Sequence, residues 1–179
     1  MNHKCYLHTP IGIICIEADE EAVTALYFDR DYEEQYNLTE TFGAEAEVFD
    51  RTRSSIDIQF LKEPETELLK KAGDQLTEYF QGKRKVFDLP LKPAGTEFQK
   101  KVWSALCTIP YGQTRSYGEI AAQIGSPKAC RAVGGANNKN PIMIFIPCHR
   151  VIGADGSLVG FGGGLYAKKY MLDLEKGEL

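Results

Sequence analysis

The sequence predicts an α+β protein built from two domains, and three observations support this prediction. Short alternating apolar stretches begin the chain, and helical periodicity dominates its second half. Between them, residues 88–95 hold two prolines and a glycine, which is typical of a linker. The charge also divides there, since residues 1–91 carry 10 Lys and Arg against 19 Asp and Glu, whereas residues 92–179 carry 11 against 6. We therefore expect an acidic domain over 1–91 and a basic domain over 92–179.

Length and composition are those of a globular protein, with 179 residues and 43% hydrophobic content. The apolar run at 142–146 is too short to cross a bilayer, and no signal-type apolar block follows the first residues. The cysteines are scattered and odd in number, which suits a reducing compartment better than a disulfide framework. We therefore expect a cytoplasmic protein with free thiols.

The first domain begins with three alternating apolar stretches, which predict an antiparallel meander over 5–7, 11–16 and 23–28. A polar region with weak periodicity follows. From Glu63 to Gln81, apolar residues recur at helical spacing and predict an amphipathic helix, which Gly82 ends. The first domain should therefore combine a small sheet with a helix.

The second domain opens with a predicted helix at 96–109. Two short helices at 116–124 and 128–138 follow, joined by a tight turn that contains Gly125 and Pro127. This arrangement is typical of a helix-turn-helix, although ordinary helical hairpins share it. The helix at 128–138 is built of small side chains. They would let its backbone come close to a nucleic-acid groove, but they suit tight helix packing equally well.

The charge of the second domain indicates an interaction surface. A net charge of −4, spread evenly, would argue against a nucleic-acid partner. Between Phe98 and Leu172, however, the sequence contains nine basic residues and only two acidic ones, Glu119 and Asp155. Such asymmetry favours an interaction surface, and chance clustering of surface charge is the alternative.

The segment 144–152 carries the strongest chemical signal, because this apolar β-like run turns at Pro147 and places Cys148 beside His149. A lone buried cysteine is more often packing than a nucleophile. Here His149 and Arg150 could supply the proton acceptor and the cation that favour a thiolate. Neighbouring side chains on a strand point to opposite faces, so we expect His149 to need a water or a local bend to reach the sulfur.

The motif 147–151 (Pro-Cys-His-Arg-Val), preceded by 131–136 (Arg-Ala-Val-Gly-Gly-Ala) and by Asn140-Pro141, resembles the O6-alkylguanine-DNA alkyltransferases. The likeness runs from about Phe98 to Glu175 in order and spacing. It implies an N-terminal ribonuclease-H-like α/β domain and a C-terminal winged-helix-like helical domain with a helix-turn-helix. It also implies direct-reversal DNA repair without a cofactor, by irreversible single-turnover transfer of the alkyl group from O6-alkylguanine to the protein. Activity on O4-alkylthymine stays open.

The resemblance also implies catalytic roles for particular residues. Cys148 matches the accepting cysteine, and His149 matches the base that draws the thiol proton through a bound water. Glu175 matches the glutamate that orients the histidine, and Asn140 matches the asparagine that braces the turn around the cysteine. Without the resemblance, Glu175 is interpreted as a solvated charge at a helix end and Asn140 as a helix terminator.

For DNA, the resemblance implies a monomer that places the second helix of the pair in the minor groove of a duplex. Arg131 would fill the stack after the damaged base is flipped out, which costs a few kcal/mol. Tyr117 would press on the neighbouring phosphate and donate to the base. Three more residues fall at positions that contact the DNA backbone: Gln99, Gly118 and Ser126.

The glycine-rich loop 160–164 lacks the residues of a phosphate-binding or dinucleotide-binding loop. The resemblance makes it the lid of the base pocket, with Phe161 as a stacking wall. The base contacts that it implies are the carbonyls of Cys148 and Val151 and the N–H of Gly162. Met143 lies at the rim where some relatives carry proline, so the tolerance for bulky alkyl groups stays open.

We expect no metal site, because four residues near the N-terminus fit no standard ligand spacing: His3, Cys5, His8 and Cys15. Two alternatives come from other functional classes. A DNA-binding damage sensor would bind without chemistry, although the sensor relatives lack the cysteine. A cysteine hydrolase using Cys148 and His149 would need an oxyanion site, and the sequence shows none.

Overall fold

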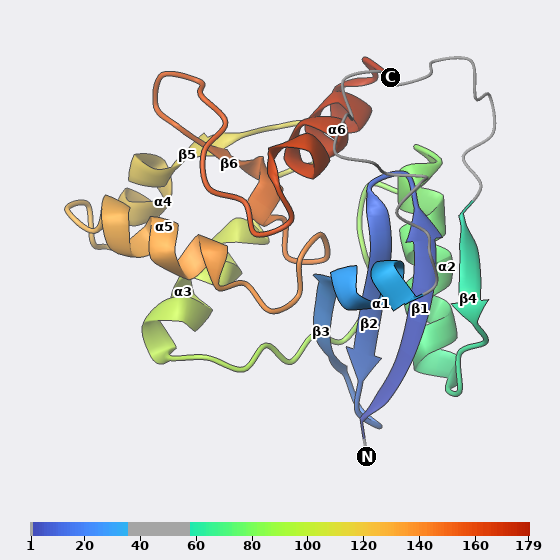
Figure 1. Ribbon diagram of the computed structural model, residues 1–179. Helices are drawn as coiled ribbons and strands as arrows, with labels where there is room; N and C mark the ends of the chain where they lie inside the picture. The colour runs from blue at the N-terminus through green and yellow to red at the C-terminus, as the bar shows by residue number, and fades with distance from the viewer. Residues whose placement is uncertain (1, 36–57) are drawn as a thin grey trace. The chain divides into compact units, whose positions relative to one another are not determined.

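The computed structural model describes residues 2–35 and 58–179, and the chain divides into two compact units, Met1–Pro90 and Leu91–Leu179 (Figure 1). Helices and strands occur in both units, which confirms the predicted α+β class. Within the described residues, no helix combines the length and the apolar character that crossing a membrane requires.

An antiparallel sheet organises the first unit. It contains β1 (His3–Thr9), β2 (Gly12–Ala18), β3 (Val23–Phe28) and β4 (Gln59–Lys62), in the order β3-β2-β1-β4. The first three strands confirm the predicted meander. The fourth was not predicted, because its four residues are too short for a period-2 pattern to stand out.

In the described part of this unit, the sheet is accompanied by the helices α1 (Arg30–Gln35) and α2 (Glu67–Phe80). The side chain of Thr66 caps α2 by accepting a hydrogen bond of 3.2 Å from the Leu69 backbone N–H. This cap explains why the helix begins at Glu67 and not at the predicted residue 63. The buried face of α2 packs on β1 and β2, and these elements form the core of the unit.

Four α-helices, one 3-10 helix and a short pair of parallel strands make up the second unit, every residue of which is described. The helices are α3 (Glu97–Leu106), α4 (Tyr117–Gln123), α5 (Cys130–Asn138) and α6 (Leu165–Lys176), and the strands are β5 (Arg115–Ser116) and β6 (Val151–Ile152). The predicted helix pair is therefore present, and capping boxes at Thr96 and Ser116 begin α3 and α4.

The segment around the candidate nucleophile is not the strand that the sequence indicated. Residues Cys148–Arg150 form a 3-10 helix, and only Val151–Ile152 continues as a strand. Pro147 has no N–H to donate, so a strand ladder cannot run through it. Ile144 has a φ of 72°, a left-handed conformation that turns the chain just before the proline. These two features bend the chain directly before Cys148 and His149.

A glycine in α2 tests the packing of the first unit. Alanine normally stabilises a helix interior by about 1 kcal/mol relative to glycine. A Cβ on Gly73 would collide with the ring of Phe60 in β4, so Gly73→Ala should instead lower the free energy of unfolding by about 1–3 kcal/mol. Urea denaturation measures this change. Gly135→Ala on α5 is the control, because no described atom lies within 4 Å of its added Cβ and the substitution should stabilise. Stabilisation by both would show that α2 does not pack closely on β4.

Candidate active site around Cys148

The 3-10 turn Cys148–Arg150 buries three functional side chains inside the second unit. Successive side chains of a 3-10 helix point about 120° apart, so they do not alternate between two faces as on a strand. Cys148 is only 2% exposed, and His149 is fully buried. The turn therefore presents a thiol, an imidazole and a guanidinium to different partners within one core.

The thiol of Cys148 is protonated at neutral pH. Burial raises its pKa to about 11, against the opposing effects of a hydrogen bond with Asn140, the charge of Lys168 and nearby backbone N–H groups. Reaction therefore needs a base that removes the proton as the new bond forms.

Asn140 holds the chain that leads to the cysteine. Its Nδ2 donates to the Ile146 carbonyl at 2.9 Å, and its Oδ1 accepts from the Ile142 N–H at 3.0 Å. Both ends of the turn before Pro147 are thus fixed by one buried amide. The structure brings Asn140 to the place that its expected bracing role requires.

Glu175 on α6 is the centre of a buried polar cluster. Its Oε1 lies 2.7 Å from His149 Nε2, and its Oε2 accepts from the Gly112 N–H at 3.0 Å. Arg150 Nε donates to the same carboxylate at 2.9 Å, and Arg150 Nη2 donates at 3.0 Å. Burial alone would raise the pKa of Glu175, but the hydrogen bonds and charges of His149 and Arg150 outweigh it and lower the pKa to about 2.

His149 is arranged as a neutral base. Burial lowers its pKa below the usual 6.5, although Glu175 acts in the opposite direction. An ionised carboxylate can only accept hydrogen bonds, so Nε2 carries the hydrogen that Glu175 accepts, and Nδ1 is the basic nitrogen. The pair can therefore take up a proton at neutral pH and stabilise the imidazolium that results.

Lys168 on α6, and not Arg150, is the cation that acts on the thiol. The Arg150 guanidinium donates to the Glu175 carboxylate, and its Nη1 donates to the Ile109 carbonyl at 2.7 Å. Lys168 is fully buried, and its Nζ donates to the carbonyls of Val151 at 2.5 Å and Val159 at 2.9 Å. Burial lowers the pKa of Lys168 to about 8, and its charge acts on Cys148.

The sequence reasoning missed Lys168, although a signal was present. Lys168 and Glu175 are seven residues apart on α6, a spacing that puts two side chains on the same face of a helix. Met171 lies between them on this face and is fully buried. A lysine in register with buried residues indicates a buried ammonium, but of the charged residues in this segment only Glu175 was assigned a role.

Tyr117 at the start of α4 contacts the glycine-rich loop. Its hydroxyl donates to the Val159 carbonyl at 2.9 Å, the same oxygen that Lys168 binds. Gly160 has a φ of 57°, and a Cβ there would lie 3.3 Å from the Asn138 side chain. A Cβ on Gly162 would lie 3.9 Å from Met143 Sδ. The loop that includes Phe161 therefore lies against α4, the end of α5 and the expected pocket rim.

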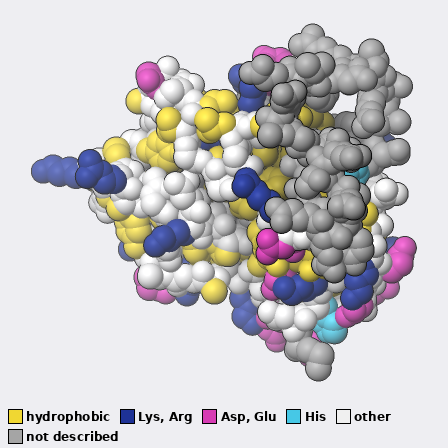
Figure 2. All heavy atoms as spheres, viewed as in Figure 1, with side chains coloured by type: hydrophobic (Ala, Val, Ile, Leu, Met, Phe, Trp, Pro, Cys, Tyr) yellow, Lys and Arg dark blue, Asp and Glu magenta, His cyan; other side chains and the backbone are white. Residues whose placement is uncertain are grey.

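The expected DNA contacts do not all lie on the helix pair. Arg131 is exposed on α5, Gly118 lies in the first turn of α4, and Ser126 lies in the turn between these helices. Gln99 lies on α3, where its Oε1 accepts from the Thr96 N–H at 2.8 Å in the capping box. Figure 2 shows Lys and Arg side chains projecting over α4, α5 and the turn between them.

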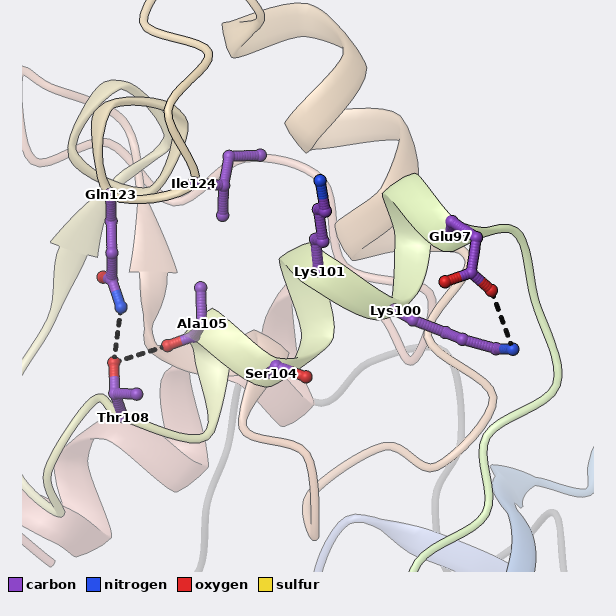
Figure 3. Close-up of a pocket in the computed structure, with 8 residues that line it drawn as sticks. All are labelled: Glu97, Lys100, Lys101, Ser104, Ala105, Thr108, Gln123 and Ile124. Atoms are coloured by element: carbon purple, nitrogen blue, oxygen red, sulfur yellow. Dashed lines mark hydrogen bonds and ion pairs between the residues drawn. The ribbon is translucent and has the colours of Figure 1, made fainter.

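Two surface hollows lie elsewhere on the second unit. Residues 126–129 line one, and the outer face of α3 with the end of α4 lines the other (Figure 3). In the second hollow, Gln123 donates to Thr108 and Lys100 pairs with Glu97. Neither hollow includes a residue of the Cys148 cluster. In the described part of the chain, no group of His, Cys, Asp and Glu is placed to hold a metal ion.

Comparison with known proteins identifies the family. Residues 2–93 match the ribonuclease-like domain of 6-O-methylguanine DNA methyltransferase, and residues 97–177 match the DNA binding domain of the same family. The chain belongs to this family. A methylated-DNA–protein-cysteine methyltransferase of Methanosarcina acetivorans is 46% identical over 93% of this chain and 94% of its own length. The constitutive enzyme of Bacillus subtilis is 42% identical over 98% of this chain and 96% of its own.

Solved structures agree with this family. The O6-methylguanine methyltransferase of Mycobacterium tuberculosis superposes with a TM-score of 0.77 at 43% identity, covering 100% of this chain and 95% of its own. The protein from the same organism in complex with DNA gives a TM-score of 0.73 at 43% identity, covering 96% and 93%. The predicted fold, a ribonuclease-like domain followed by a DNA-binding domain, is confirmed. The family performs direct-reversal DNA repair by alkyl transfer to a cysteine of the protein itself.

The Glu175 cluster predicts a pH-dependent stability. Glu175→Gln leaves Arg150 buried without its counter-charge, so the free energy of unfolding at pH 7 should fall by about 3–5 kcal/mol. Because the pKa of Glu175 is about 2 in the folded protein and ordinarily 4.5, this contribution is complete above pH 4.5 and is lost as pH falls toward 2. Urea denaturation at pH 7 and pH 3 should show the difference from wild type narrowing. Exposed Glu178→Gln should change little at either pH, and a constant difference for Glu175→Gln would refute the ionic role.

Proposed function

We propose that this chain repairs O6-alkylguanine in DNA by transferring the alkyl group to Sγ of its own Cys148, once per molecule. The observation that carries the assignment is the contact with Glu175 of His149, the residue that follows Cys148 in the buried 3-10 turn. The other four cysteines are Cys5, Cys15, Cys107 and Cys130, and none of them adjoins this pair in the sequence. A base oriented by a carboxylate is the usual arrangement for activating a nucleophile.

In the proposed reaction, His149 takes the Cys148 proton through a water while Sγ attacks the alkyl carbon. The S–C bond forms as the C–O6 bond breaks, and the leaving guanine takes up one proton. Glu175 stabilises the imidazolium, and the charge of Lys168 favours the developing thiolate. The product thioether is too stable to return the alkyl group, so the protein is consumed. Asn140 keeps Cys148 in place throughout.

We propose that a duplex binds through its minor groove to a monomer, with α5 in the groove and Arg131 replacing the flipped base. The exposed position of Arg131, the small side chains of α5 and the relative solved with DNA support this arrangement. Gly118 and Ser126 would contact the phosphate backbone through their N–H groups. Gln99 would do so from the start of α3.

The flipped base would lie among Tyr117, Val151, Phe161 and Gly162. The hydrogen bond of Tyr117 to Val159, next to the glycine-rich loop, supports a pocket with this loop as its lid. We assign transfer and DNA binding to residues 92–179, with residues 1–91 as a separate domain. We also propose a cytoplasmic location, because all five cysteines are free thiols, as a reducing compartment requires.

Intact-mass analysis tests the acceptor. After incubation with a duplex that carries one O6-methylguanine, the wild type should gain a single methyl group, and peptide mapping should place it on Cys148. Cys148→Ser should bind the duplex with unchanged affinity and gain no mass. Cys107→Ser, which changes an exposed cysteine at the end of α3 and outside α5, should react as the wild type does. Methylation of Cys148→Ser would assign another acceptor, and tight binding by wild type without an adduct would indicate a damage sensor.

The flipping role of Arg131 predicts a difference between two substrates. Flipping costs a few kcal/mol in a duplex and nothing for the free base, so Arg131→Ala should slow repair of duplex DNA about tenfold or more. Its reaction with free O6-alkylguanine should stay near the wild-type rate. Single-turnover rate constants on both substrates measure the effect. Equal losses on the two would remove the flipping role.

A further inference from the structure

Asn137 lies on the buried face of α5, six residues after Arg131. It is 2% exposed and packs inward beside Val133 and Ala136. It is distinct from Asn140, which follows the helix and holds the turn before Pro147. The side chain of Asn137 therefore belongs to the proposed recognition helix and points toward the interior.

The amide of Asn137 reaches the acceptor residue itself. Its Nδ2 donates to the backbone carbonyl of Cys148 at 3.4 Å, close to the upper limit for a hydrogen bond. The same carbonyl accepts from the Val151 N–H at the end of the 3-10 turn. The orientation of the amide is fixed, because a flipped amide would place its oxygen against the carbonyl oxygen.

The other end of this amide is unsatisfied. Asn137 Oδ1 is buried, and no donor in the described residues reaches it. A buried acceptor without a partner destabilises a folded protein, and an apolar side chain of similar size would avoid that cost. Stability therefore does not explain an asparagine at this position, whereas a task at Cys148 does.

We propose that Asn137 is a positioning residue through which the engagement of α5 with DNA is transmitted to Cys148. This inference rests on the proposed function. The helix is held near this point by Trp103, whose Nε1 donates to the Ala136 carbonyl at 2.9 Å. A small displacement of α5 toward the turn would shorten the long Asn137–Cys148 hydrogen bond and fix the carbonyl, and with it the direction of Sγ. The cysteine is thereby best aligned when α5 is in the groove.

The test compares duplex and free-base rates in Asn137→Leu, which keeps the approximate size of the side chain and removes both polar atoms. The single-turnover rate constant on duplex O6-methylguanine should fall about threefold to tenfold, as expected for one lost hydrogen bond. The rate with free O6-methylguanine and the dissociation constant for the duplex should stay within twofold of wild type. The melting temperature should be equal or higher, because the unsatisfied acceptor is gone.

Two further variants keep the inference falsifiable. Asn137→Ser is too short to reach the Cys148 carbonyl and should reproduce the selective loss if the leucine variant does not fold. Val133→Ala removes buried packing from the same helix and should lower the melting temperature without changing the ratio of the two rates.

The outcomes distinguish failure of the coupling role of Asn137 from failure of the proposed function. An unchanged ratio of duplex to free-base rates in Asn137→Leu or Asn137→Ser would overturn the coupling role, whether or not stability changed. A wild type that forms no adduct on either substrate would instead refute the proposed function. A selective loss on duplex DNA, with unchanged affinity and undiminished melting temperature, would establish Asn137 as the link.

Discussion

The buried carboxylate of Glu175 is the interaction on which the second unit depends. It joins α6 to the 3-10 turn through His149 and Arg150 and to the loop before β5 through the Gly112 N–H. A charge this far from water is tolerable only because each oxygen has several donors. The same contacts orient His149, while burial lowers its pKa and keeps it neutral. The cluster that holds the domain together therefore also prepares the base, and a substitution at Glu175 would disturb both.

Much of the fold could be predicted from the sequence, because many of its strands and helices follow from local residue patterns. Alternation gave the meander of the first unit, and caps at Thr96 and Ser116 marked two helix starts. The strand β4 lies beyond such reasoning, since it depends on pairing with β1 and not on its own four residues. The 3-10 turn at Cys148 was missed for a related reason, because an apolar composition does not show where Pro147 and Ile144 bend the chain.

The candidate site was predictable only in part. Cys148 and His149 were singled out by their chemistry, whereas Glu175 and Asn140 were named only from a resemblance to a family. The structure places these residues around one buried turn. The burial of Lys168 and the inward direction of Asn137 depend on tertiary packing. A lysine and an asparagine are usually exposed, so composition points away from both. Only the packing of α5 and α6 around the turn shows that these two polar side chains reach Cys148 or its neighbours.

The burial of Cys148 has a consequence for the lifetime of a molecule that is used once. Peroxides and small disulfides react with accessible thiolates, and a thiol that is 2% exposed with a pKa of about 11 offers them almost none. Cys107 and Cys130, by contrast, lie on the surface and meet such reagents first. If Cys148 is the acceptor, as we propose, the site keeps its one reactive thiol in a protonated, unreactive form until a lesion is bound. A protein that cannot turn over is protected in this way from being spent on anything else.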